Sequence, residues 1–346
     1  MTIGNYNIDK NSPVFIIAEL SANHNGSIKT AIETIKAAKR AGANCIKLQT
    51  YRADTMTIES DKDDFLIKDT IWEGKNLYKL YQEAYTPWEW HQELFKVAKN
   101  EGLVCFSSPF DKTAVDFLET LNVPAYKIAS FEITDIPLIE YVASKGKPII
   151  ISTGVANIED IELAIEACKR NGNSNIALLK CTSSYPAPIE EANISIIKDL
   201  AERFNVISGL SDHTMGSTVP IVATTLGAKI IEKHFIIDRS IGGPDASFSM
   251  NEQEFTKMVK AIREAEKAIG KVDYRLTEKQ KKGRDFSRSL YIVEDIKKGE
   301  IITSKNVRSI RPGFGLHPKF LPEILGKKTN KNVFKGDRLD LDVISK

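Results

Sequence analysis

Long hydrophobic runs are missing from this sequence of 346 residues. No stretch approaches the roughly 20 apolar residues that a membrane-spanning helix needs, and the opening residues MTIGNYNIDK contain no apolar core of a signal peptide. The formal net charge is only +2, with acidic and basic residues mixed along the chain, which gives no reason to expect a nucleic-acid or membrane partner. We therefore expect a cytoplasmic enzyme or binding protein.

Two common functional motifs are also absent. The four cysteines, Cys45, Cys105, Cys168 and Cys181, show no Cys-x-x-Cys spacing, so neither a zinc site nor a redox motif of that type is predicted. Three of them lie in or beside strand-like runs, and we expect buried, reduced thiols. No Gly-x-Gly-x-x-Gly pattern follows the first strand-like run, which disfavours an open dinucleotide-binding sheet.

Eight apolar runs alternate with helix patterns along most of the chain, and they cover residues 14–20, 45–49, 103–109, 125–130, 148–154, 176–183, 206–213 and 229–235. Between them, apolar residues recur every three or four positions, as on an amphipathic helix. The last helix pattern begins with Asn251 and Glu254, spaced as in a capping box. These units predict an α/β fold, a closed (β/α)₈ TIM barrel over residues 1–274; an open doubly wound sheet is the alternative.

Four segments depart from this alternation. Residues 1–13 are predicted to form a short hairpin that would plug the bottom of the barrel, and residues 51–85 are long for one connection and suggest a lid-like loop with a short helix. Residues 275–285 are basic and are expected to be a linker. Residues 286–346 show short strands and turns and predict a small second domain. That domain is marginal on its own by core size, so it would gain stability by docking on its own barrel or a partner's.

Two histidines lie at the ends of consecutive strand-like runs, His213 in ISGLSDHT and His234 in KIIEKHF. Side chains on a strand repeat every second residue, so Ser211 shares a face with His213, and Glu232 shares a face with His234. Imidazoles at the same ends of neighbouring parallel strands can bind one metal ion and leave positions open for substrate. The alternative is two unrelated surface histidines.

Two lysines, Lys47 and Lys127, point into the barrel mouth by the same alternation. A buried lysine is costly unless an anion pairs with it. Hydroxyl groups surround the two lysines, from Ser108, Ser130, Ser152 and Ser211. This combination predicts a site for a small phosphate or carboxylate, unless the lysines reach solvent. Glu19 and Glu132 would transfer protons or form salt bridges to a barrel lysine.

Further candidate substrate-binding residues follow the strand ends: Gln49, Phe110, Ser183, Tyr185 and Asp245. An anion pocket beside a metal that polarises a carbonyl suggests a reaction that joins a phosphorylated three-carbon unit to an aldehyde. Two alternatives remain open. One is a Schiff-base aldolase with Lys127 or Lys47 as the nucleophile, and the other is a non-catalytic binding protein.

An ordered set of motifs resembles the bacterial sialic acid synthases: FIIAELSANHNGS, GANCIKLQTY, CFSSPFD, AYKIASFE, IISTG, GLSDHT, IEKHF, RSLY and RPGFGLHPKF. The resemblance covers nearly the whole chain, including a C-terminal part similar to the family's antifreeze-like (SAF, β-clip) domain. It implies a metal-dependent condensation of phosphoenolpyruvate with an N-acetylated sugar aldehyde, which gives a nine-carbon 2-keto acid and phosphate.

Within this family, the AELSANHNG and RPGFG variants resemble pseudaminic acid synthases, whose sugar is 2,4-diacetamido-2,4,6-trideoxy-L-altrose. An apolar lining, such as Phe314 and Leu316, would suit that sugar. An N-acetylneuraminate or legionaminate synthase that acts on another N-acetylated hexose is the alternative.

The resemblance also implies roles for individual residues. His213 and His234 resemble ligands of manganese, with magnesium or cobalt as other possible ions, and Glu19 resembles an acid near the metal-bound water. The implied phosphoenolpyruvate contacts are Lys47, Lys127, Ser130, Ser152 and Ser211. The implied sugar contacts are Gln49, Glu132, Tyr185, Asp245 and, from the C-terminal domain, Arg311. In the family that domain comes from the other subunit of a domain-swapped homodimer.

Overall fold

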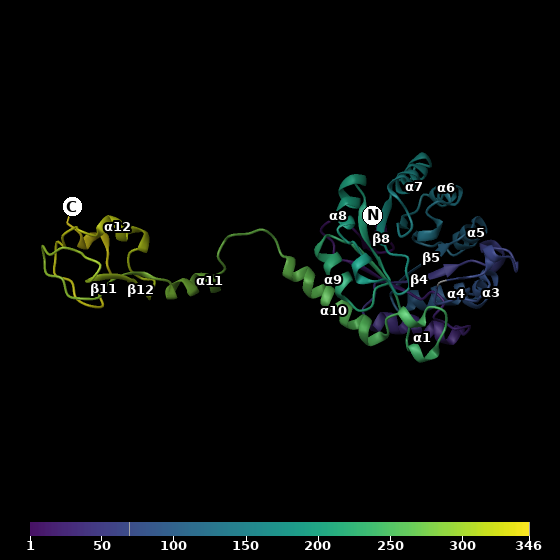
Figure 1. Cartoon of the computed structure of the whole chain (residues 1–346), viewed down its shortest axis with the longest axis horizontal. Helices are drawn as coiled ribbons and strands as arrows, with labels where there is room; N and C mark the ends of the chain where they lie inside the picture. The colour runs from purple at the N-terminus through teal and green to yellow at the C-terminus, as the bar shows by residue number, and fades with distance from the viewer. Residues whose placement is uncertain (69, 346) are drawn as a thin grey trace. The chain divides into compact units, whose positions relative to one another are not determined.

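The computed structural model describes residues 1–68 and 70–345. Asp69, inside the predicted lid-like segment, and Lys346, the last residue of the predicted second domain, lie outside the described residues. The chain divides into two compact units, Met1–Gly270 and Lys271–Lys346 (Figure 1). The segment predicted as a linker contains a short helix, α11 (Glu278–Gly283).

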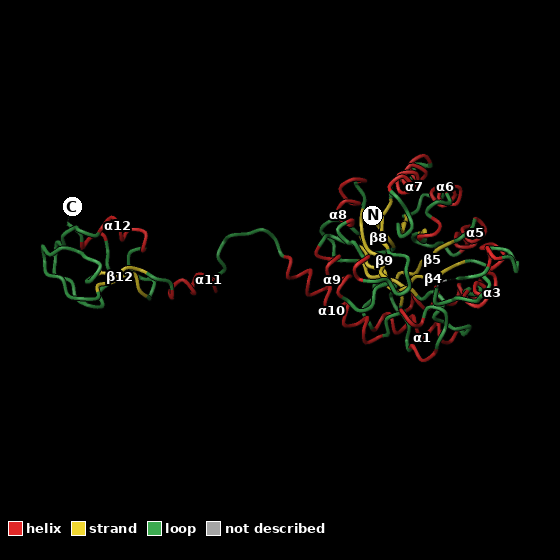
Figure 2. Tube along the Cα trace, in the orientation of Figure 1, coloured by secondary structure: helices red, strands yellow, loops and turns green. Residues whose placement is uncertain are grey.

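Eight parallel strands close into a barrel in the first unit, in the order β10-β3-β4-β5-β6-β7-β8-β9. Their bounds are β3 Phe15–Glu19, β4 Cys45–Thr50, β5 Val104–Pro109, β6 Tyr126–Ile128, β7 Ile149–Ser152, β8 Ile176–Cys181, β9 Ile207–Asp212 and β10 Ile230–His234. Every predicted strand is present, so the predicted barrel is confirmed and the open sheet is excluded. Figure 2 shows these strands in yellow, surrounded by red helices.

The helices that follow the strands bury apolar residues against the barrel. Their bounds are α1 Ile28–Arg40, α4 Trp88–Asn100, α5 Lys112–Thr120, α6 Ile136–Ala143, α7 Ile158–Arg170, α8 Ile196–Phe204, α9 Thr218–Thr225 and α10 Glu252–Ile269. The predicted capping box of α10 is confirmed. The Asn251 side chain accepts from the Glu254 backbone at 3.0 Å, and the Glu254 carboxylate accepts from the Asn251 backbone at 3.0 Å.

The inner face of the barrel changes from apolar at the bottom to polar at the top. On β3 the inward residues are Phe15, Ile17 and then Glu19, because side chains alternate along a strand. At the bottom, an antiparallel hairpin of β1 (Thr2–Ile3) and β2 (Tyr6–Asn7) packs Ile3 and its neighbour Ile8 onto the apolar interior. The predicted plug is therefore present, and the polar layer faces the opposite end.

The second unit has its own small apolar core. An antiparallel pair, β11 (Ser289–Ile292) and β12 (Val307–Ile310), packs with α12 (Leu321–Ile324). The short strands predicted for this part of the chain are therefore present. All four cysteines are free and buried, as expected. Among the described helices, none is long and apolar enough to cross a membrane.

Candidate active site

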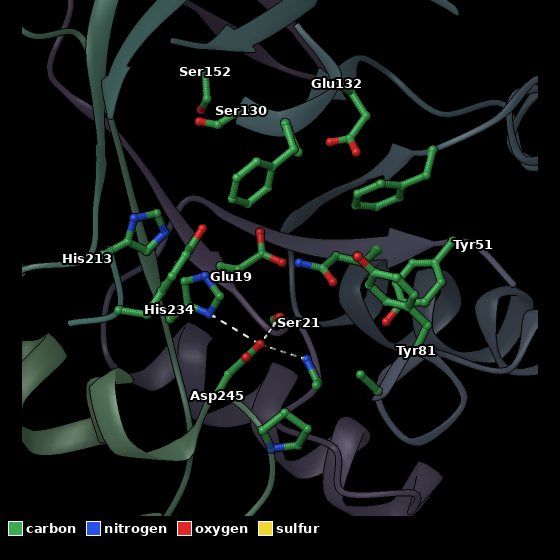
Figure 3. Close-up of a pocket in the computed structure, with 18 of the residues that line it drawn as sticks. Glu19, Ser21, Tyr51, Tyr81, Ser130, Glu132, Ser152, His213, His234 and Asp245 are labelled. Carbon is green, nitrogen blue, oxygen red and sulfur yellow. Dashed lines mark hydrogen bonds and ion pairs between the residues drawn. The ribbon is translucent and has the colours of Figure 1, made fainter. Parts of the chain in front are cut away.

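A cavity of about 430 Å³ lies where the barrel strands end. Its lining includes most of the residues that the sequence proposed, and Figure 3 shows how several of them face one another. The proposed residues in the lining are Glu19, Lys47, Gln49, Phe110, Lys127, Ser130, Glu132, Ser152, Tyr185, Ser211, His213, His234 and Asp245. Parallel strands bring them together because their carboxyl ends meet at one end of the barrel.

Three proposed residues are not part of this lining. Ser108 pairs in register with Gln49 but is buried, with 1% of its surface exposed. The Ser183 hydroxyl lies 3.8 Å from the sulfur of Cys181, beside the cavity. Arg311 is exposed in the second unit, which also contains Phe314 and Leu316.

A cluster of four buried charged groups forms the floor of the cavity. Lys47 Nζ lies 2.6 Å from Glu19 Oε2 and 3.0 Å from Glu232 Oε1. Lys127 Nζ lies 3.5 Å from the same oxygen of Glu232, and Ser211 Oγ donates to that oxygen at 3.0 Å. The strand register sets these contacts, since Glu19 is opposite Lys47 and Ser211 is opposite Glu232.

The cluster adds a feature that strand alternation does not show. Glu232 and Glu19 provide opposite charge to the two lysines within the protein, and binding of a substrate anion by the lysines stays a prediction. Burial opposes ionisation of Glu232, yet Lys127 and Lys47 outweigh it and hold its pKa below the ordinary value. Burial lowers the pKa of Lys47, and Glu232 offsets only part of that effect. Glu19 forms the salt bridge that was the alternative to its role in proton transfer.

Glu232 is the main residue that the sequence analysis left out of the site. Its position two residues before His234 gave the signal, because both side chains then point to the barrel interior. Strand alternation shows which face of the sheet a side chain occupies, but not which residue of the next strand it contacts, so the pairing of Glu232 with the lysines was not predicted. Other lining residues absent from the prediction include the polar side chains of Ser21, Tyr51, Tyr81 and Cys181.

The two imidazoles face each other, with ring centroids 5.3 Å apart. His213 Nδ1 lies 3.0 Å from the Thr182 carbonyl oxygen, which can only accept, so Nδ1 carries a proton and Nε2 is the ring nitrogen that a cation could bind. His234 Nδ1 lies 3.7 Å from Asp245 Oδ2 (Figure 3). Burial lowers the pKa of His234 well below its usual value, which keeps this imidazole neutral and able to bind a cation.

These features fit a divalent metal ion. A ligating histidine commonly donates its other ring N–H to a carbonyl or carboxylate, and His213 does so. Glu19 Oε2 pairs with Lys47, whereas Glu19 Oε1 is buried without a hydrogen-bond partner among the described residues. Glu19 is also opposite His234 in register. Residues 1–68 and 70–345 contain no cluster of three or more His, Cys, Asp and Glu ligands. An ion held by the histidines would therefore keep several positions for water and substrate.

A second buried pair fixes the strands that carry the histidines. Asp212 and Lys233 are partners in register, one residue before His213 and His234, and point to the outer face. Lys233 Nζ lies 2.5 Å from Asp212 Oδ2, with both side chains 2% exposed, and also donates to the Thr214 carbonyl. The pair links β9 to β10 at the level of the imidazoles.

The segment between β4 and α4, residues 52–85, is called the lid segment here. It contains α2 (Ala53–Met56) and α3 (Leu77–Ala84) and contributes side chains to the cavity lining. Trp72 Nε1 donates to the Pro244 carbonyl at 3.0 Å, which ties the lid segment to the loop after β10. The connection predicted as lid-like, residues 51–85, therefore contributes to the cavity lining, and its role as a lid stays a prediction.

Comparisons with known proteins place the chain in a family. Residues 34–274 match the NeuB family and residues 287–342 match the SAF domain. The chain is 52% identical over 339 residues to the pseudaminic acid synthase of Campylobacter jejuni strain 81-176, with 98% of each covered. It is 49% identical over 335 residues to the pseudaminic acid synthase of Helicobacter pylori, with 96% of this chain and 98% of the relative covered.

A solved structure agrees with the sequence relatives. N-acetylneuraminic acid synthetase from Leptospira borgpetersenii, in complex with citrate, is 31% identical, with a TM-score of 0.73 over 82% of this chain and 94% of that chain. The chain belongs to the NeuB family, and the resemblance drawn from its motifs is confirmed.

The first prediction concerns the shared carboxylate. Glu232→Gln keeps the shape of the side chain but leaves two buried lysines short of one negative charge, so we expect a loss of about 3–5 kcal/mol in the free energy of unfolding. Added inorganic phosphate should stabilise the variant more than the wild type, because the lysines would then bind it. Urea denaturation with and without phosphate measures both effects.

The matched control is Glu252→Gln. Glu252 pairs with Arg40 at 2.7 Å on the surface, where an ion pair contributes about 0–1 kcal/mol. Equal stability of Glu232→Gln and wild type, or equal stabilisation of both by phosphate, would contradict the proposed charge balance.

The second prediction concerns Glu132. Burial raises its pKa to about 7, from a usual value of 4.5, although Lys127 opposes the shift. The unfolded chain loses this proton near pH 4.5 and the folded chain near pH 7, so ionisation lowers stability across that window and the loss persists above it. Glu132→Gln mimics the protonated acid. It should raise the Tm relative to wild type at about pH 8, by an amount that shrinks toward pH 4.5.

The exposed Glu190 provides the control, because Glu190→Gln should give no pH-dependent difference in Tm. A Tm difference for Glu132→Gln that stays constant between acid and alkaline pH would show that its ionisation is not coupled to folding.

Proposed function

We propose that this chain is a pseudaminic acid synthase, which condenses phosphoenolpyruvate with 2,4-diacetamido-2,4,6-trideoxy-L-altrose to give pseudaminic acid and phosphate. The observation that carries the proposal is the cavity in which the paired imidazoles lie beside the lysine–carboxylate cluster. The choice of sugar rests on the 52% and 49% identity to pseudaminic acid synthases.

In this proposal, the two substrates occupy different parts of the cavity. Phosphoenolpyruvate is bound by Lys47, Lys127, Ser130, Ser152 and Ser211. The sugar is bound by Gln49, Glu132, Tyr185, Asp245 and Arg311, with Ser108, Phe110 and Ser183 in supporting positions. His213 and His234 would hold a divalent ion, manganese in preference to magnesium or cobalt, which when bound polarises the aldehyde oxygen.

The proposed reaction forms one carbon–carbon bond and breaks one carbon–oxygen bond. The double-bond electrons of phosphoenolpyruvate form a bond from carbon 3 to the aldehyde carbon, and the aldehyde oxygen takes up a proton. Water adds to carbon 2, and Glu19, whose Oε1 is buried without a hydrogen-bond partner in the described chain, orients that water and accepts its proton. Phosphate then leaves the tetrahedral carbon with the electrons of its C–O bond, and the carbon-2 hydroxyl loses its proton as its oxygen forms the ketone.

The protein is further proposed to act in the cytoplasm as a domain-swapped homodimer. Arg311 would then reach the sugar from the second unit of the other subunit. The small core of that unit supports the proposal, because a domain of this size gains stability by docking.

The third prediction is an assay of substrate choice. With manganese and phosphoenolpyruvate, phosphate release should be fastest, by kcat/KM, for the diacetamido trideoxy sugar, and slower for N-acetylmannosamine or the legionaminate precursor. In ¹⁸O-labelled water the label should enter the keto acid. His234→Ala should lower turnover by at least ~10²–10³-fold, because a preorganised charge-stabilising group is lost.

Each alternative gives a different result. A preference for another N-acetylated hexose would indicate an N-acetylneuraminate or legionaminate synthase. Label in the released phosphate would refute C–O cleavage. Borohydride trapping of pyruvate on Lys127 or Lys47, without inhibition by EDTA, would indicate a Schiff-base aldolase.

A further inference from the structure

The cavity has two chemically different ends. Figure 3 shows His213, His234 and Glu19 on one side and Tyr51 and Tyr81 on the opposite side. The first side is made by barrel strands and contains the groups proposed to act on the aldehyde. Tyr81 belongs to α3, so the second side is made in part by the lid segment.

The lid segment presents hydrocarbon and an indole ring to the cavity. Its larger apolar lining residues, called the lid wall here, are Met56, Ile67, Trp72, Leu77 and Leu80, and Tyr81 and Ala84 of the same segment also line the cavity. The one polar atom of the Trp72 side chain is already bonded to the Pro244 carbonyl, so the ring offers only its apolar surface. Among the charged residues of the segment that the structure describes, none is part of the cavity lining, and Lys62, Asp63 and Asp64 are exposed.

The orientation of the sugar follows from its chemistry. Carbon 1 is the aldehyde that reacts, so it must lie at the end with the imidazoles. The remaining carbons of the open chain then extend away from the strands, and carbons 4 and 6 approach the opposite side. Compared with N-acetylmannosamine, the proposed sugar has an acetamido group at carbon 4 and a methyl group at carbon 6 in place of hydroxyl groups, in addition to differences in configuration.

We propose that the lid wall selects the sugar by receiving its carbon-6 methyl and the methyl of its carbon-4 acetamido group. A hexose with hydroxyl groups there would have to desolvate them against apolar side chains, whereas methyl groups lose nothing by leaving water. A single methylene in an apolar pocket gives about 10–200-fold discrimination in kcat/KM. The inference rests on the proposed function and assigns specificity to the lid segment rather than to Phe314 and Leu316.

Two substitutions at separate points of the lid wall test the inference. Leu77→Asn and Ile67→Thr each place a polar group where a methyl group is expected. The measurement is the ratio of kcat/KM for the diacetamido trideoxy sugar to that for N-acetylmannosamine, together with the KM for phosphoenolpyruvate. Each variant should lower the ratio by about 10-fold or more, with the KM for phosphoenolpyruvate unchanged.

The control is Lys79→Gln, on an exposed position of the same helix α3, which should leave the ratio unchanged. If one variant fails to fold by circular dichroism, the other decides. The inference alone would be overturned if the wild-type protein acts on the diacetamido sugar but the folded variants keep the wild-type ratio of kcat/KM values for the two sugars. If the wild-type protein has no activity on that sugar, the proposed function is wrong, and this inference, which rests on it, is wrong as well.

Discussion

One buried carboxylate, shared between two lysines, is the constraint on which the upper half of the barrel depends. Glu232 lies 3.0 Å from Lys47 and 3.5 Å from Lys127, and Glu19 pairs with Lys47 from the other side. Isolated charges at this depth would be prohibitively costly, so the strands must stay in the register that brings these groups together. The same register places Glu19 opposite His234. The same strand register therefore satisfies both the charge balance of the cluster and the geometry of the site.

The charge balance also gives the cavity its chemistry. Two ammonium groups and two carboxylates leave the floor close to neutral when all four are ionised. A divalent cation at the imidazoles would add positive charge beside it, and phosphoenolpyruvate would supply the compensating anion. On the outer face, Asp212 and Lys233 link the two histidine-bearing strands. In this arrangement the strands perform the reaction, and the connecting segments distinguish one sugar from another.

Much of this arrangement could be predicted from the sequence because periodic patterns determine it. The eight apolar runs predict the barrel, and strand alternation directs Lys47, Lys127, His213 and His234 inward. The partner of Lys127 could not be read in this way, because register between strands is a property of the folded barrel. The lid segment has no simple period, so the apolar surface it turns to the cavity was not foreseen. The sequence places Arg311 in a separate unit but does not indicate what it binds. Its assignment to the sugar rests on family resemblance.

A crystal structure with manganese and phosphoenolpyruvate tests the central claim most directly. The account predicts anomalous signal between His213 and His234, and contacts from Lys47 and Lys127 to the anionic groups of phosphoenolpyruvate. An ion bound elsewhere, or a phosphoenolpyruvate molecule that touches neither lysine, would contradict it.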